Sequence, residues 1–97
     1  MDIVFADQKL ALVETDRAAE TRLSLALIES LRDKLGALRS ARDERFLRTW
    51  KSLHYEQLER PGNQKSIRLN KQWRLVFTID TKVIPNRLTI LGVEDYH

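Results

Sequence analysis

Two runs of alternating residues on either side of Asn70-Lys71 constrain the fold of this chain most. Apolar residues flank Arg68 before the turn, and apolar side chains recur at every second position from Trp73 to Ile79 after it. Because successive side chains of a strand point to opposite faces of a sheet, this period of two predicts a β-hairpin with one apolar face. If that face packs on helices, Arg68 and Arg74 share the other face.

A stripe of leucines in the first half of the chain predicts a long helix. Its members recur at spacings of four, four, four and three, which places them on one helical face. Thr21 is the expected N-cap, and Gly36 is expected to weaken the last turns by about 1 kcal/mol relative to alanine. We interpret the stripe as the core face of the helix. Its members are Leu23, Leu27, Leu31, Leu35 and Leu38.

The remaining segments complete an α+β fold with helices on one face of the sheet, in a single domain of residues 1–97. Residues 44–58 fit either a helix, with Phe46, Trp50 and Leu53 at helical spacing, or an ordered loop that carries His54. In the first half of the chain we also expect a strand at residues 2–5, a short helix at 7–14 begun by Asp7, and a polar connector at 14–20. In the second half we expect a turn at Pro61-Gly62-Asn63, a loop at 80–86 and a last strand at 87–93.

The composition excludes several classes of protein. The chain has no cysteine, which excludes disulfides and thiolate zinc sites. It has no apolar run near the ~20 residues of a membrane helix and no signal-like start, so we expect a cytoplasmic protein without a membrane partner. Metal-ligand spacing, a glycine-rich phosphate loop and a serine-nucleophile motif are all missing, and we expect no cofactor.

Positive charge is concentrated in the second half of the chain. The net charge is +3, and residues 60–79 contain five basic side chains and no acidic one. One-sided positive charge is typical of proteins that bind polyanions, and it also suits an acidic protein partner. The five are Arg60, Lys65, Arg68, Lys71 and Arg74.

The only two histidines, His54 and His97, are candidates for a general acid and a general base. Cleaving RNA without a metal needs one group to take the 2′-OH proton and another to protonate the departing 5′-oxygen, and imidazole suits both roles. Asp95 can orient a ring, and Tyr96 can stack on a base or donate to a phosphate. More than forty positions separate the two histidines, so the sequence leaves their proximity open.

Three stretches carry a family resemblance. They are Leu53-His54, the run from Ser66 to Phe77 with its Trp-Arg-Leu-Val-Phe strand, and the terminal Glu94-Asp95-Tyr96-His97. Together they resemble the HigB-type toxins of the RelE/ParE superfamily. The resemblance implies a small domain in which an N-terminal strand and two helices pack on a curved antiparallel β-sheet.

The resemblance also implies a function. Such a protein is the toxin of a type II toxin-antitoxin module, an endoribonuclease that cuts mRNA on the 70S ribosome and so inhibits translation. A helix-turn-helix antitoxin of the HigA kind neutralises it, and operator DNA is bound only through the antitoxin complex. By position, the catalytic residues are His54, Asp95, Tyr96, His97 and Arg74, and the RNA- or phosphate-binding residues are Arg68, Lys65, Lys71 and Arg60.

This chain departs from the family after its Leu-His pair. The family continues with proline, leucine, lysine and glycine, whereas this chain continues with a longer, acid-containing segment from Tyr55 to Gly62. The family's lysine has no clear counterpart in this chain, and Arg60 and Lys65 are the candidate substitutes.

Two other functions remain open from the sequence. One is a ParE-like toxin that binds DNA gyrase through its sheet and cleaves nothing, which would not need the terminal acid, aromatic and imidazole groups. The other is a basic regulatory module that binds nucleic acid, for which steeply salt-dependent binding to free duplex DNA would be expected.

Overall fold

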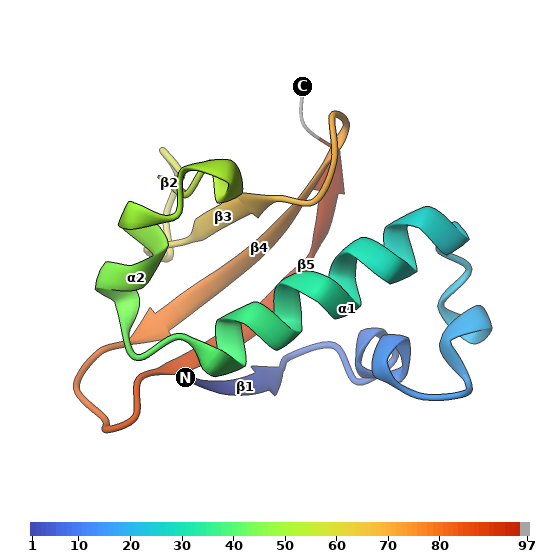
Figure 1. Cartoon of the computed structure of the whole chain (residues 1–97), viewed down its shortest axis with the longest axis horizontal. Coiled ribbons are helices and arrows are strands. Elements are labelled where there is room, and N and C mark those ends of the chain that lie inside the picture. Colours follow the sequence, from blue (N-terminus) through green and yellow to red (C-terminus); the bar gives the residue numbers. More distant parts are fainter. Residues whose placement is uncertain (96–97) are drawn as a thin grey trace.

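A five-stranded sheet is the centre of the structure, a computed structural model that describes residues 1–95. The strands are β1 (Asp2–Phe5), β2 (Glu56–Gln57), β3 (Lys65–Arg68), β4 (Trp73–Asp80) and β5 (Arg87–Asp95), in the spatial order β1-β5-β4-β3-β2. The helices are the 3₁₀ segments η1 (Leu10–Glu14), η2 (Ala18–Thr21) and η3 (Lys51–Leu53) and the α-helices α1 (Leu25–Ser40) and α2 (Glu44–Thr49). Helix α1 lies across one face of the sheet (Figure 1).

The expected hairpin is present as β3 and β4, and its register confirms the shared face of the two arginines. Ile67 pairs with Leu75, and Arg68 pairs directly with Arg74. The expected N-terminal strand is also present. It pairs with β5 in parallel, so the sheet is mixed, whereas the pairs β2–β3, β3–β4 and β4–β5 are antiparallel.

Four of the five leucines in the stripe form the core face of α1, as expected, whereas Leu23 lies before the helix. Leu31, Leu35 and Leu38 are fully buried against the apolar side chains of β3, β4 and β5. The expected N-cap at Thr21 is wrong. Thr21 ends η2, the next residue is left-handed, and the hydroxyl of Ser24 accepts a hydrogen bond from the amide of Leu27 at 3.2 Å. The helix therefore begins three residues later than the stripe suggested.

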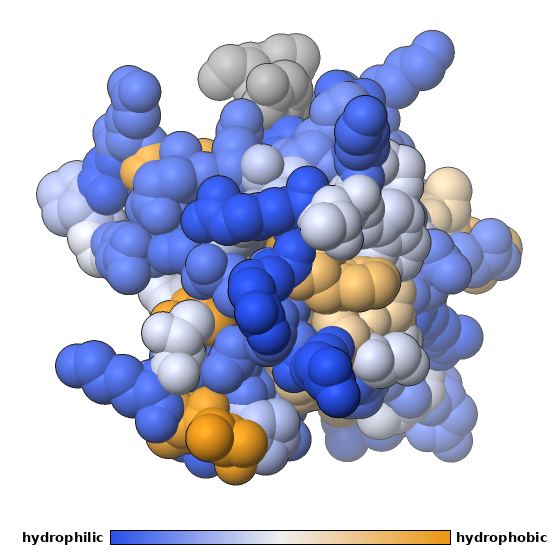
Figure 2. All heavy atoms as spheres, turned by 60° about the vertical axis from the view of Figure 1, so that its left-hand side comes forward, coloured by the Kyte–Doolittle hydropathy of each residue, from blue (hydrophilic) through white to orange (hydrophobic). Residues whose placement is uncertain are grey.

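The ambiguous stretch of residues 44–58 contains both a helix and an ordered loop. Helix α2 begins after Asp43, whose side chain accepts from the Arg45 amide, and η3 follows it. His54 then adopts a left-handed conformation, with φ 49° and ψ 49°, and the chain turns into β2. The side of the molecule that carries α2 is turned toward the viewer in Figure 2 and is mostly hydrophilic, with small apolar patches between charged side chains.

The last strand runs to Asp95, two residues beyond the expected end, and contains a bulge. Phe77 pairs with Ile90, but Val76 pairs with Gly92, so Leu91 has no residue opposite it. Beyond the bulge Val93 pairs with Leu75, and Glu94 pairs with Arg74. The end of β5 is therefore placed beside the two arginines of the hairpin. Within residues 1–95, no helix has the length and apolar character needed to cross a membrane.

Candidate active site

The face of the sheet opposite α1, which we call the open face, carries the hairpin arginines. Pairing across the strands puts Arg68, Arg74 and Glu94 in one row of this face. Ser66 and Glu56 pair in a neighbouring row on the same face. Neighbouring strands lie about 4.8 Å apart, so these polar groups are within reach of one another.

His54 meets both arginines at the edge of the open face. Its carbonyl oxygen accepts a hydrogen bond from Nη2 of Arg74 at 2.5 Å, and its ring Nε2 lies 3.3 Å from Nη1 of Arg68. A guanidinium can only donate, so Nε2 must accept in this contact, and a neutral ring carries its proton on Nδ1. The left-handed backbone at His54 makes this possible, because it ends η3 and turns the ring toward β3.

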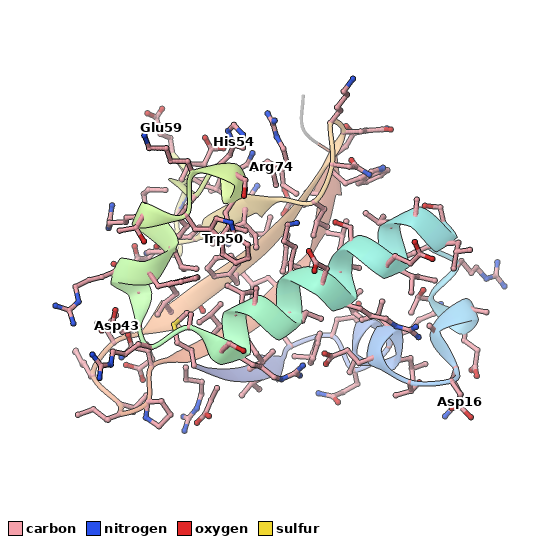
Figure 3. All side chains as sticks on the ribbon, in the orientation of Figure 1. Asp16, Asp43, Trp50, His54, Glu59 and Arg74 are labelled. Carbon is pink, nitrogen blue, oxygen red and sulfur yellow. The ribbon has the colours of Figure 1, made fainter. Side chains whose placement is uncertain are left out.

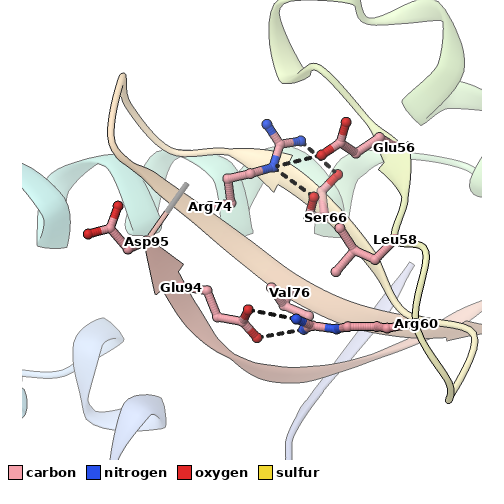
Figure 4. Close-up of a pocket in the computed structure, with 8 residues that line it drawn as sticks. All are labelled: Glu56, Leu58, Arg60, Ser66, Arg74, Val76, Glu94 and Asp95. Carbon is pink, nitrogen blue, oxygen red and sulfur yellow. Dashed lines mark hydrogen bonds and ion pairs between the residues drawn. The ribbon is translucent and has the colours of Figure 1, made fainter. Parts of the chain in front are cut away.

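Arg74 is a buried residue, not a surface arginine. Its side chain is only 5% exposed, and its Nε donates to Oγ of Ser66 at 2.7 Å. The same Nε lies 3.5 Å from Oε1 of Glu56. These two contacts, drawn in Figure 4, hold the guanidinium against the strands. The hydrogen bond from Arg74 to the carbonyl of His54 ties the loop of His54 to the sheet.

A pocket of about 440 Å³ lies on the open face beside Arg74. It contains three carboxylates, from Glu56, Glu94 and Asp95, and two arginines. The second arginine, Arg60, binds Glu94 through two contacts of 2.6 and 2.9 Å (Figure 4). This contact holds the pKa of the Glu94 carboxyl below its ordinary value and raises the pKa of Arg60. The pocket is therefore acidic overall, and its cations already face carboxylates. We call it the acidic pocket.

The basic residues expected to bind RNA do not form one patch. Lys65 lies on the face of Ile67, away from the arginines, is 7% exposed, and donates from Nζ to Oδ1 of Asn63 at 3.0 Å. Arg60 is engaged by Glu94, and Lys71 is exposed in the β3–β4 turn. Of the four, Arg68 is the one that contacts His54.

The expected catalytic groups at the end of the chain are partly described. Asp95 pairs with Trp73 across the strands, and its carboxylate accepts from the side chain of Gln72 at 3.2 Å. Tyr96 and His97 lie outside the described residues. The distance between the two histidines, on which the sequence argument depends, is therefore not tested.

Sequence reasoning missed three polar residues around Arg74. Ser66 falls on the face of Arg68 by simple alternation and would have been found had the predicted strand begun one residue earlier. Glu56 and Glu94 had no such signal, because β2 is only two residues long and the bulge changes the alternation of β5.

A second pocket, of about 300 Å³, lies beside His54. It is lined by Leu47, Arg48, Trp50, Lys51, His54 and Tyr55. Figure 3 shows Trp50, His54 and Arg74 gathered around the turn that follows α2. We call this the aromatic-basic pocket. Neither pocket is a metal site by its donors, since no three His, Asp or Glu side chains among residues 1–95 could hold an ion together.

Comparison with known proteins assigns the chain to a family. The sequence model described as "RelE-like toxin of type II toxin-antitoxin system HigB" matches residues 4–92. No curated protein matches the chain.

Three solved structures share the fold at low sequence identity. A YoeB/ParE toxin from Agrobacterium tumefaciens has a TM-score of 0.61 at 15% identity, with both chains covered completely. A YoeB dimer and a YoeB–YefM complex, both from Staphylococcus aureus, have TM-scores of 0.58 and 0.57 at 19% and 18% identity, covering all of this chain and 97% of theirs. The expected α+β fold class is thereby confirmed.

Proposed function

Because the chain belongs to the HigB-like family of RelE-like type II toxins, we propose that it is a ribosome-dependent endoribonuclease that cuts mRNA at the edge of the open face. The contact between the His54 ring and Arg68 carries this proposal. It combines a group that can move a proton near neutral pH with a guanidinium that matches phosphate oxygens, which are the two needs of metal-independent RNA cleavage.

His54 is the proposed general base. Its Nε2 accepts from Arg68, so its lone pair already points toward the group that would hold the phosphate. When Arg68 binds the scissile phosphate, the imidazole takes the 2′-OH proton and the 2′-oxygen attacks the adjacent phosphorus. The bond from phosphorus to the 5′-oxygen breaks, and the products are a 2′,3′-cyclic phosphate and a 5′-OH end.

The terminal residues are the proposed source of the second proton. His97 would protonate the leaving 5′-oxygen, Asp95 would orient a ring, and Tyr96 would stack on a base or assist at the phosphate. The register of β5 supports this proposal. It places Asp95 opposite Trp73, one position from the pair formed by Arg68 and Arg74.

Arg74 supports this chemistry from beneath. Its buried guanidinium donates to the carbonyl of His54 and so fixes the loop that carries the ring. Few further cations surround the site, so we expect weak activity on free RNA, with the 70S ribosome supplying the bent substrate geometry. A helix-turn-helix antitoxin is the proposed inhibitor and link to operator DNA. The solved YoeB–YefM complex supports the coarser part of this proposal, a protein partner.

The test is cleavage of a defined mRNA by the purified protein with and without ribosomes. We expect cuts only when ribosomes are present, and fragments that end in a 2′,3′-cyclic phosphate. His54→Asn and His97→Ala should each slow cleavage by about 10²–10⁴-fold, the usual contribution of a general acid or base. Asparagine is chosen because it tolerates the left-handed backbone of position 54.

Two results would reject the assignment. One is full toxicity on expression of both His54→Gln and His97→Ala. The other is an SOS response with intact mRNA, which would favour the gyrase-binding alternative.

A further inference from the structure

The pocket lined by His54 and the pocket lined by its hydrogen-bond partner Arg74 have opposite charge. The acidic pocket contains three carboxylates and two arginines. The lining of the aromatic-basic pocket contains Arg48 and Lys51 and no carboxylate, and Glu44, outside this lining, has its Oε1 3.4 Å from Nη2 of Arg48. Because binding of nucleic acid depends mainly on neutralising phosphates, a single strand passing His54 would be attracted to the second pocket and repelled by the first.

The aromatic-basic pocket also offers a ring of fixed orientation. Trp50 is half-buried and packs edge-on against Phe46, with the ring centroids 5.4 Å apart at 69°. Tyr55 is enclosed between Phe77, which it stacks on at 6.3 Å, and the guanidinium of Arg48, 5.5 Å from its centroid. Tyr55 is as half-buried as Trp50, but these two contacts occupy its ring, whereas among the described residues no guanidinium or parallel ring lies on Trp50. A partly exposed, immobilised ring is a platform for a nucleobase.

The position of the pocket relates it to the proposed chemistry. His54 lines the pocket and contacts Arg68 on the open face, so a nucleotide held there lies directly beside the phosphate at that arginine. The volume of about 300 Å³ is at the lower end of small-molecule sites, which suits one nucleotide and not a folded partner.

We propose that the aromatic-basic pocket holds one nucleotide of single-stranded RNA next to the scissile phosphate, with its base against Trp50 and its phosphate against Lys51 and Arg48. This subsite rests on the proposed nuclease function and specifies how that site holds its substrate. A single ring accepts any base by stacking, so the pocket provides affinity with little sequence preference.

The experiment uses Trp50 as its own reporter. The chain has two tryptophans, so a Trp73→Phe protein emits from Trp50 alone. It is titrated with a tetranucleotide that is 2′-O-methylated throughout, which cannot be cut because its 2′-oxygens carry no proton. We expect saturable quenching of the Trp50 emission. Far-UV circular dichroism establishes that each variant is folded.

Lysine variants separate a pocket from general attraction. In the Trp73→Phe background, Lys51→Ala should weaken binding by about tenfold and reduce the slope of log Kd against log salt by nearly one. Lys82→Ala removes the same charge from the exposed loop after β4 and should change Kd by less than a factor of about two. Equal effects of the two substitutions, or no quenching at millimolar oligonucleotide, would overturn the proposal. Tighter binding of hexaglutamate than of the oligonucleotide would also overturn it, by assigning the pocket to an acidic peptide.

The measurement separates the subsite from the nuclease function because the probe cannot react. Quenching that depends on Lys51, in a protein that cuts no mRNA on ribosomes, supports the subsite and rejects the nuclease. Ribosome-dependent cleavage that is unchanged in Trp50→Ala, in a protein whose Trp50 is not quenched, rejects the subsite alone.

Discussion

At the scale of single residues, the sequence could place the two hairpin arginines but not the contacts they make. A period of two assigns Arg68 and Arg74 to one face, and the register agrees. The approach of His54 depends on a left-handed backbone after a 3₁₀ turn, and no periodicity announces such a turn. The burial of Arg74 likewise comes from Ser66 and Glu56, which a single strand's pattern cannot bring together.

The ion pair of Arg60 and Glu94 predicts a pH-dependent stability. The hydrogen bond from Arg60 lowers the pKa of Glu94, so the folded state favours the charged carboxylate. Its contribution is present above the ordinary pKa of about 4.3 and is lost as the pH falls through the lower folded value. We expect Glu94→Gln to be less stable than the wild type toward urea at pH 7, and the two to converge near pH 3.

Glu29 gives a matched control for this prediction, because it is an exposed glutamate on α1, on the opposite side of the sheet. Glu29→Gln should leave the pH dependence unchanged. A constant difference between Glu94→Gln and the wild type from pH 7 to pH 3 would mean that the ion pair does not contribute to folding.

At the scale of elements, regular patterns were reliable and their ends were not. The leucine stripe located α1, but two hydroxyl residues, Thr21 and Ser24, both stand where an N-cap is plausible. The choice between them is made by the left-handed Arg22 and by η2, which are not visible in the spacing of leucines. The bulge in β5 is hidden in the same way, since it shifts an alternation by one residue without changing the composition.

Glycine 36 provides a test of the helix itself. Gly36 is exposed in the interior of α1, and a methyl group added there meets no atom within 4 Å. Alanine should therefore raise the free energy of unfolding by about 0.5–1 kcal/mol, because glycine loses more backbone freedom in a helix. Thermal unfolding of Gly36→Ala measures the gain.

The turn at Gly62 is the contrasting position. Its φ is +97°, and an added Cβ would lie 3.2 Å from the side chain of Gln64. Gly62→Ala should lower the melting temperature. A decrease for both glycines would mean that α1 does not tolerate a side chain at position 36.

At the scale of the whole molecule, the fold followed from the sequence and the distribution of charge did not. The basic stretch of residues 60–79 predicted a single positive face. In the folded chain Lys65 is on the opposite face, Arg60 is paired with Glu94, and the charged groups divide between an acidic and a basic pocket. Charge counted along a sequence misses carboxylates that arrive from distant strands, and here β2 and β5 supply them.

The unpaired Leu91 has a consequence for how the molecule tolerates changes in length. Deleting Leu91 would join Ile90 to Gly92, whose partners Phe77 and Val76 are already adjacent, so every other pair of β4 and β5 is kept. Deleting Val93 would instead place Glu94 opposite Leu75, in the apolar core. We expect the first deletion to melt cooperatively and the second not to, as followed by circular dichroism on heating. One residue of this strand is thus a spacer, and its removal keeps Glu94 opposite Arg74 and Asp95 opposite Trp73.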